Sequence, residues 1–386
     1  MITRKRSRSP GLLPISNDCL IISESGRALA GVAVQAGYTT AVIDRFGDDD
    51  TRRIAASVHV YRDPATDFAN YALLKSLVQA SGLTTAGCIV TGSGFDSCPR
   101  VLEALAVDYP VMGNRARTIR EIKDPDIFFP ALDRLGIHRP NLSRNLPANN
   151  DHWLCKRVGG SGGGHIQDAC LDNGEHTYYQ QYIAGSSYSL VFLADGRHAV
   201  SIGLNKTWCR ERDPHPYRFG GALAVPVWDL AGYQKMNEII RALTRHFGLY
   251  GLCGLDFVVS ADDGEIVVLE VNPRPTATLS LHETNRPLFS AHIEAFQGRL
   301  VEGIAGMPGP QPGMQILYAD RDFCVPDHVD WPLWAADIPG ANQAIKKGEP
   351  CCTVYAEGSD ITDVRELLDE RCRTLERSIF RIAASC

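Results

Sequence analysis

Residues 253–281, CGLDFVVSADDGEIVVLEVNPRPTATLSL, contain two apolar runs, at 254–259 and 266–271, that are joined by Asp262-Asp263-Gly264. Two such runs around a short link that contains glycine predict a β-hairpin. Gly264 suits the left-handed position of a three-residue loop because it has no side chain to clash. The rest of the chain can be placed around this hairpin.

One face of the predicted hairpin carries polar side chains. With residues 261 and 265 flanking the loop, Asp256 lies directly opposite Glu270, and Asn272 falls on the same face because side chains alternate along a strand. The other face is apolar and suits a core: Leu255, Phe257, Val259, Val267, Leu269 and Val271. Carboxylate and amide oxygens are ligands of hard cations, so the polar face predicts a Mg²⁺ site. The alternative is an exposed face with solvated acids.

The residues after the second run, Pro273-Arg274-Pro275-Thr276, favour the metal site over the exposed face. Two prolines end the strand and predict a stiff turn around the arginine. A guanidinium held next to a metal cluster suits phosphate or carboxylate, which arginine binds with two parallel hydrogen bonds.

Length and composition indicate a globular protein of several domains. The chain has 386 residues, of which 44% are hydrophobic and 22% charged. A net charge of -6 and the lack of a long basic stripe argue against a nucleic-acid partner. No window is long and apolar enough to span a membrane, and residues 1–10 are basic without being followed by the apolar run of a targeting signal. We expect those residues to form a disordered tail.

The cysteines indicate a reducing environment. The 12 cysteines in so long a chain do not form a disulfide framework, and no CxxC pair exists to hold zinc. We therefore expect a cytoplasmic protein with no membrane partner.

Residues 17–113 predict an α/β domain. Its opening βαβ unit consists of a buried strand, a helix and a second strand at 18–23, 27–36 and 40–43. The turn after the first strand lacks GxGxxG, so no dinucleotide is expected there. A third strand, at 86–90, is followed by the loop 91–96. Loops at that edge of an open sheet bind ligands, so this loop is either a substrate contact or a plain turn.

A glycine-rich loop at 158–165 follows the predicted strand 153–157, which contains Lys156. Its backbone N–H groups could close over an anion, and Lys156 supplies a positive charge. A flexible linker is the alternative. The loop also matches GxSxG with Ser161 as a hydrolase nucleophile, but that motif needs a helix directly after it, and the two following glycines disfavour one.

The middle of the chain predicts an antiparallel sheet followed by a helix. A strand at 178–183 precedes a hairpin formed by 188–193 and 198–204, and an amphipathic helix covers 230–247. Between them, residues 205–221 form a polar stretch that contains Lys206 and Arg218. We expect this stretch to be a mobile functional lid, with a solvated loop as the alternative.

The C-terminal part predicts a small β lobe and a charged helix at 360–383, after a hinge-like break at 306–313. The expected divisions are a disordered tail, an α/β domain, a central domain of two lobes and this C-terminal lobe, at 1–16, 17–113, 114–304 and 305–386.

Lys156 before a glycine-rich loop, YQQYIAG at 179–185 and LDFVV with VLEVNPRPT around residue 270 together resemble the ATP-grasp superfamily of ligases. The likeness covers residues 18–355, and IKKGEPCCTVYAEG is similar to the terminal lobe of biotin-carboxylase-like members. It implies an ATP-grasp fold of the α/β and α+β classes, with a Rossmann-like N-terminal pre-domain and a small C-terminal β lobe.

The resemblance implies a role for each matching residue. Lys156 would contact ATP phosphates below a flexible loop formed by Gly160, Ser161, Gly162, Gly163 and Gly164. The backbone of Gln180, Gln181, Tyr182 and Ile183 would hold adenine. Asp256, Glu270 and Asn272 would bind Mg²⁺, with Mn²⁺ as an alternative. Arg274, Lys206 and Arg218 would grip the substrate carboxylate or the transferred phosphoryl group.

Two positions depart from the family pattern. The family usually has an acid in the segment that holds adenine, where this chain has Gln180 and Gln181. The first family lysine is expected near Pro125, and Lys123 is the candidate for its place.

The implied activity is ATP-dependent ligation of a small-molecule carboxylic acid to an amine, through an acylphosphate, with release of ADP and phosphate. YRFGGAL and the pre-domain resemble the carboligase-like branch, some of whose members accompany biosynthesis of the one-carbon carriers methanofuran and methanopterin. The alternatives are a nucleotide-binding module without turnover and a phosphotransferase with the same ATP grip. The resemblance leaves a homodimer open.

Overall fold

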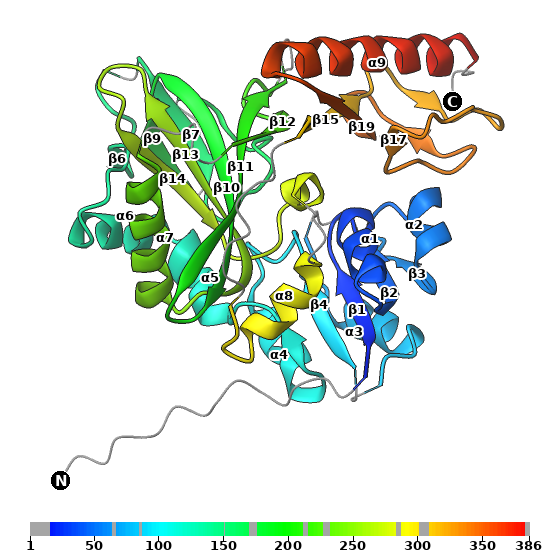
Figure 1. The fold of residues 1–386 in the computed structure, drawn as a ribbon, viewed down its shortest axis with the longest axis horizontal. Coiled ribbons are helices and arrows are strands. Elements are labelled where there is room, and N and C mark those ends of the chain that lie inside the picture. Colours follow the sequence, from blue (N-terminus) through cyan, green and yellow to red (C-terminus); the bar gives the residue numbers. More distant parts are fainter. Residues whose placement is uncertain are drawn as a thin grey trace.

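The computed structural model describes residues 16–63, 67–84, 87–149, 151–169, 176–210, 215–226, 232–282, 287–300 and 309–382, with 380–382 as backbone only. The tail expected at 1–16 lies outside these ranges except for Ser16. Of the break expected at 306–313, residues 309–313 are described, and a strand already begins at Gln311. In Figure 1 the N-terminal α/β region lies on one side of a large antiparallel sheet, and the C-terminal helix packs on the C-terminal strands of that sheet.

The N-terminal region is an open parallel sheet with the strand order β3-β2-β1-β4-β5, which confirms the predicted α/β class. The first βαβ unit is the one predicted from the sequence. Two helix starts follow local rules: Asn70 caps α3 by accepting from the N–H of Leu73, and Pro125 opens α6, where no N–H is needed. The elements are β1 (Asp18–Ile22), α1 (Arg27–Gln35), β2 (Thr39–Asp44), α2 (Asp49–Ile54), β3 (Ser57–Val60), α3 (Tyr71–Ala80), β4 (Cys88–Thr91), α4 (Arg100–Asp108), β5 (Val111–Met112), α5 (Ala116–Lys123) and α6 (Pro125–Arg134).

The large sheet has eight strands in the order β14-β13-β10-β11-β12-β15-β19-β17. The predicted hairpin in 188–204 is confirmed as the β10–β11 pair. Strands β15 and β19 follow β12 in the same sheet, so the C-terminal strands continue it. Its strands are β10 (Gly185–Asp195), β11 (Ala199–Cys209), β12 (Phe219–Val225), β13 (Tyr250–Ser260), β14 (Ile266–Asn272), β15 (Gln311–Tyr318), β17 (Ala335–Ala336) and β19 (Pro350–Gly358).

A smaller sheet with the order β6-β9-β7-β8 carries the residues around the glycine-rich loop. Its strands are β6 (Leu142–Ser143), β7 (Trp153–Arg157), β8 (Gln167–Asp168) and β9 (Thr177–Gln181). The remaining elements are α7 (Tyr233–Phe247), the 3-10 helix η2 (Ala277–Leu281), α8 (Leu288–Ala295), the paired strands β16 (Phe323–Cys324) and β18 (Ala344–Ile345), and α9 (Ile361–Ile382). Helix α7 ends at Gly248, whose φ of 66° is left-handed.

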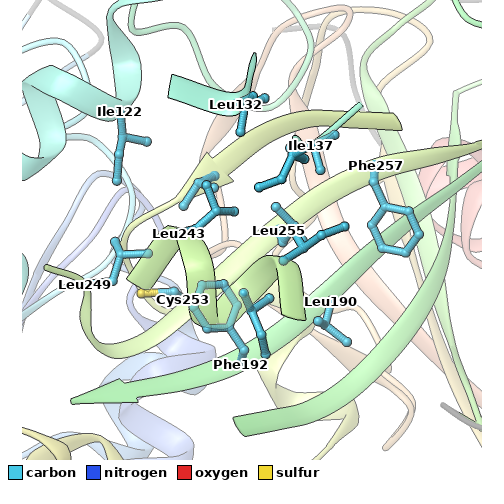
Figure 2. Close-up of a cluster of buried hydrophobic side chains, with 14 of the residues drawn as sticks. Ile122, Leu132, Ile137, Leu190, Phe192, Leu243, Leu249, Cys253, Leu255 and Phe257 are labelled. Carbon is cyan, nitrogen blue, oxygen red and sulfur yellow. The ribbon is translucent and has the colours of Figure 1, made fainter. Parts of the chain in front are cut away.

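The main core forms where α7 packs against one face of the large sheet. Leu243 of α7, Phe192 of β10 and Leu255 of β13 are completely buried and belong to one cluster, which Figure 2 shows with Ile122 and Leu132. Truncating such a leucine to alanine typically costs about 2–5 kcal/mol. Because this core holds the apolar face of β13, the polar face of the hairpin is directed away from α7.

The hairpin register places Asp256 opposite Glu270, as predicted, but for a different reason. The loop is one residue longer than predicted, because the N–H of Ser260 donates to the carbonyl of Glu265 and residues 261–264 connect the strands; Gly264 has the expected left-handed φ, 73°. Next to it, however, Val259 pairs with Ile266, one position away from the expected register. An irregularity between Asp256 and Phe257 restores the register. Leu269, expected in the core, lines a cavity instead, so that prediction was wrong.

The prediction of one long loop at 205–221 was also wrong. Strand β11 continues to Cys209 and pairs with β12, which begins at Phe219. Only residues 210–218 connect the two strands, and 211–214 lie outside the described ranges. The polar residues at 205–207 misled the prediction, although Asn205 is completely buried within β11.

No helix in the described part of the chain is both long and apolar enough to cross a membrane. Most cysteines in the described ranges are free thiols, whereas Cys324 is disulfide-bonded.

Candidate active site

A cavity of about 860 Å³ lies between the large sheet, the smaller sheet, the N-terminal region and the C-terminal strands. Its size is typical of pockets for small molecules and cofactors. The predicted site residues that line it are Lys156, Ser161, Gly162, Gly163, Gln180, Tyr182, Ile183, Asp256, Glu270, Asn272 and Arg274. The structure therefore brings together most of the residues that the sequence singled out.

The floor of the site is the polar face of the β13–β14 hairpin. Asn272 Nδ2 donates to Asp256 Oδ2 at 2.8 Å, so the amide joins the two strands. Burial and the nearby Glu270 raise the pKa of Asp256 to about 6. Burial would also raise the pKa of Glu270, but Lys123 and Lys156 outweigh it and lower that pKa to about 2. Two facing carboxylates are thus held together by surrounding cations.

Lys123, at the end of α5, is inserted into this cluster. Its Nζ donates to Glu270 and, at 3.2 Å, to Asn272 Oδ1. The side chain is 6% exposed, and its Nζ also lies 3.7 Å from Asp96 Oδ2. Burial would lower the pKa of Lys123, but Asp96 and Glu270 raise it above the ordinary value. The structure thus places the lysine proposed for the first family position next to the hairpin acids.

Arg274 is fixed by Asp96 on its other side. Its Nε lies 3.3 Å from Asp96 Oδ2, and its Nη2 donates to Asn272 Oδ1 at 3.3 Å. Burial alone would lower the pKa of the guanidinium, but Asp96 and Glu270 raise it. The turn with two prolines therefore presents a rigidly held cation to the cavity.

Asp96 is the main residue that residue patterns alone did not assign to the site. It is 7% exposed and bridges Lys123 and Arg274. The sequence feature that could have identified Asp96 is its position at the end of the loop 91–96. This loop follows β4, at the edge where parallel sheets bind ligands. Its side chain contacts protein cations, so the loop is part of the site.

The glycine-rich loop lies over the same cavity. Lys156 is 5% exposed, and its Nζ donates to Gln180 Oε1 at 3.2 Å. His165 faces the carbonyl of Ser161 at 3.3 Å, and burial and Lys156 lower its pKa to about 4. The residues after Ser161 form turns and then β8, not a helix, so the hydrolase motif lacks the context it needs.

Gly160 and Gly164 lie at the edges of the loop. Gly160 borders a small hollow that Lys123, Lys156 and Glu270 also line. Gly164 lies next to the guanidinium of Arg218, since a Cβ at Gly164 would be 3.6 Å from Arg218 Nε.

The segment that would hold adenine continues from β9. Gln180, at 3% exposure, is bound to Lys156, whereas Gln181 accepts from Asn141 Nδ2 at 2.8 Å. Tyr182 and Ile183 line the cavity, and Tyr182 is 44% exposed. The two amide side chains are thus used within the protein, and the two residues that follow them border the cavity.

Lys206 and Arg218 lie apart from the cluster. Lys206 pairs with Tyr188 on β10, and Asp256 pairs with the next residue on that strand, Ser189. Because adjacent residues of a strand point to opposite faces, the side chains of Lys206 and Asp256 lie on opposite faces of the sheet. Arg218 donates to the carbonyl of Gly348 and stacks on Tyr318 at 5.2 Å from the ring centre. It therefore connects the glycine-rich loop with the C-terminal strands.

The hairpin residues fit a hard cation by their chemistry. Asp256, Glu270 and Asn272 offer oxygen atoms at one end of a cavity, and two carboxylates this close favour a shared cation. No group of at least three His, Cys, Asp or Glu suited to a metal occurs in the described ranges. A cation here would complete its shell with water and phosphate oxygens, which is usual for Mg²⁺.

Comparison with known proteins identifies the fold. Residues 113–278 match the family model of the ATP-grasp domain. An uncharacterized protein of Methanocaldococcus jannaschii is 25% identical over 286 residues, which cover 69% of each chain. The arginine-specific carbamoyl phosphate synthase large chain of Geobacillus stearothermophilus is 24% identical over 280 residues, which cover 64% of this chain and 24% of that one.

A solved structure extends the likeness to almost the whole chain. The biotin carboxylase domain of Hydrogenobacter thermophilus 2-oxoglutarate carboxylase, in complex with MgADP, ADP and bicarbonate, has a TM-score of 0.70 at 12% identity. The match covers 95% of this chain and 90% of that one, so the two share a fold. Residues 113–278 therefore match the ATP-grasp domain, and the chain as a whole shares the fold of this biotin carboxylase domain.

Proposed function

We propose that this protein is an ATP-dependent carboxylate–amine ligase that works through an acylphosphate. One observation carries the proposal: Asp256, Glu270 and Asn272 line the same cavity as Lys156 and Arg274. Oxygen ligands for a cation, a lysine for phosphate and an arginine for a second anion are the parts that phosphoryl transfer requires. The ATP-grasp domain at 113–278 supports the nucleotide.

In the first step a substrate carboxylate oxygen attacks the γ-phosphorus of ATP, the bond to the β,γ-bridging oxygen breaks, and ADP leaves. Mg²⁺ held by Asp256, Glu270 and Asn272 would offset charge on the phosphates. Lys156 binds phosphate oxygens beneath the glycine-rich loop. Arg274, fixed by Asp96, orients the carboxylate and binds the acylphosphate.

In the second step an amine nitrogen attacks the acyl carbon. The new C–N bond replaces the C–O bond to phosphate, phosphate leaves, and the nitrogen loses a proton. No nucleophilic side chain is needed, so the proposal requires no triad. Gln180 and Gln181 stand where the family usually has an acid, so we expect adenine to be held mainly by backbone groups after β9.

The proposal has three finer parts. A place in the biosynthesis of a one-carbon carrier cofactor and a homodimer rest on the sequence resemblance, and a cytoplasmic location rests on the scattered cysteines. Mn²⁺ is an alternative to Mg²⁺. We assign no carboxylate contact to Lys206 because of its face of the sheet, and we assign Arg218 to the closing of the glycine-rich loop.

The proposal is tested by ADP release from ATP in the presence of pooled carboxylic acids, with hydroxylamine added to trap an acylphosphate as a hydroxamate. ADP release that depends on an acid, together with hydroxamate, is the expected result. ATP binding without ADP release for any acid would instead support a binding module. Phosphorylated product that is stable to hydroxylamine would support a phosphotransferase.

A further inference from the structure

A second charged region borders the cavity, away from the hairpin acids. It lies where the N-terminal sheet meets the C-terminal strands, and we call it the Asp48 recess: Asp48, Asp337, Ser25 and Arg27, all of which line the cavity. Asp44 and Asp50 lie next to it. Four carboxylates therefore surround one arginine.

Three of the four carboxylates have donors within the protein. Asp337 accepts from Ser25 Oγ and Arg27 Nε, both at 3.1 Å, and also from Thr353. Asp50 accepts from the backbone N–H groups of Asp337 and Ile338, both at 2.9 Å.

Asp44 is satisfied in the same way. It accepts from the backbone N–H groups of Gly47 at 2.8 Å and Gly26 at 3.3 Å. Arg27 is likewise occupied, because its Nη2 donates to Tyr355 Oη at 2.7 Å while its Nε binds Asp337.

Asp48 is the exception. It is 4% exposed, it lines the cavity, and its carboxylate has no hydrogen-bond or ion-pair partner in the described ranges. It stands at the N-cap position of α2, where an aspartate usually accepts from the first turn, but it makes no such bond. Burial and the charges of Asp337 and Asp44 raise its pKa to about 8. A buried carboxylate without a donor is costly unless a ligand supplies one.

The group that would satisfy Asp48 is a cation with N–H donors. A primary ammonium brings three donors and a positive charge, so it forms strong, charge-assisted hydrogen bonds with a carboxylate. An anion is disfavoured here because the carboxylates outnumber Arg27. The other acid that lines this side, Glu24, is already influenced by Arg274 and Arg45.

We propose that the Asp48 recess binds the ammonium group of a cationic amine, the second substrate of the ligase. This inference rests on the proposed function, since it assigns the amine to one end of the cavity and the nucleotide and carboxylate to the hairpin end. It makes Asp48 a residue that determines specificity for positively charged amines over neutral ones.

The test is equilibrium binding, which needs no turnover. Calorimetry with 1,4-diaminobutane, n-butylamine and neutral n-butanol measures whether the wild type selects ammonium groups. We expect both amines to bind more tightly than butanol. Asp48→Asn, which keeps the shape of the side chain, should weaken binding of 1,4-diaminobutane at least about tenfold, since hydrogen bonds to charged groups are strong.

Asp49→Asn is the matched control, because Asp49 is the next residue, is exposed and does not line the cavity. It should leave amine binding unchanged. Equal binding of butylamine and butanol by the wild type, or equal amine binding by Asp48→Asn and Asp49→Asn, overturns the inference. A wild type that binds amines but releases no ADP overturns the ligase proposal and keeps the recess. Hydroxamate formation by a wild type that does not select ammonium groups keeps the ligase proposal and overturns the recess.

Discussion

Lys123 and Glu270 form an ion pair although 147 positions separate them in the chain. The lysine ends α5, and the glutamate lies on β14 opposite Asp256. Because the same ammonium also contacts Asn272 and lies near Asp96, one buried cation joins the hairpin to the loop after β4. This arrangement predicts that stability and nucleotide chemistry depend on the same side chains.

Replacing Glu270 by Gln should reduce acid-dependent ADP release at least about 100-fold, since preorganised charges at a phosphoryl-transfer site contribute on that scale. The amide keeps the shape of the side chain, so the circular dichroism spectrum should not change. Glu265→Gln is the control, because Glu265 lies on the same hairpin but binds Lys235 outside the site. Similar ADP release by the two variants would contradict the metal assignment.

Replacing Lys123 by Ala should lower the free energy of unfolding by about 3 kcal/mol, the lower end of the cost of breaking a buried ion pair. It leaves Asp96 and Glu270 without their shared cation. Urea unfolding measures the loss. Arg120→Ala removes a cation from the same helix, but its partner Glu103 is exposed, so it should cost less than about 1 kcal/mol. Equal losses of unfolding free energy in the two variants would show that the ion pair of Lys123 with Glu270 does not stabilise the fold more than an exposed pair does.

Lys156→Ala should weaken ATP binding about tenfold, because it removes the buried ammonium below the glycine-rich loop. Fluorescence titration with a labelled nucleotide measures the affinity. The neighbouring Arg157 points to the exposed side of β7, so Arg157→Ala should bind ATP like the wild type. A larger effect at Arg157 than at Lys156 would reverse the assignment of the two cations.

The two adjacent glycines of the loop should differ in their tolerance of a side chain. Gly162 and Gly163 both have positive φ, 69° and 74°, so alanine strains each backbone similarly. A Cβ at Gly163 would also lie 2.0 Å from the carbonyl oxygen of Tyr217, whereas at Gly162 nothing lies within 4 Å. Gly163→Ala should therefore lower the melting temperature and the ATP affinity more than Gly162→Ala. The opposite order would mean that the loop does not pack on Tyr217.

The stability of the protein should depend on pH through Asp48. Its pKa is about 8 in the folded protein, above the ordinary aspartate value of about 4 expected after unfolding. Between these values the folded form keeps a proton that the unfolded chain releases, so this residue lowers stability as pH rises. Asp48→Asn removes the effect. The melting temperature of Asp48→Asn minus that of the wild type should therefore increase from pH 5 to pH 8. A constant or falling difference would contradict the raised pKa of a buried, unpartnered carboxylate at Asp48.

The β-hairpin, the left-handed glycine in its loop and the pairing of Asp256 with Glu270 could be predicted from residues 253–281 alone. Alternation along a strand and the turn preference of glycine are local properties, so no distant residue is needed. The register near the loop was nevertheless one position off, and a bulge that no residue pattern announced restored it at Asp256. Leu269 therefore faces the cavity, not the core.

Residues 253–281 by themselves determined the polar face of the site, its stiff arginine turn and its apolar support. Only the tertiary structure decided which distant charged residues lie next to this polar face. Lys123 contacts Glu270 and lies near Asp96, whereas Lys206 lies on the other face of the sheet. It also left Asp48 buried in the lining of the cavity with no donor among the residues that the structure describes. The physical reason is that alternation within a strand follows from neighbouring residues, whereas contact between charges on separate elements follows from how those elements pack.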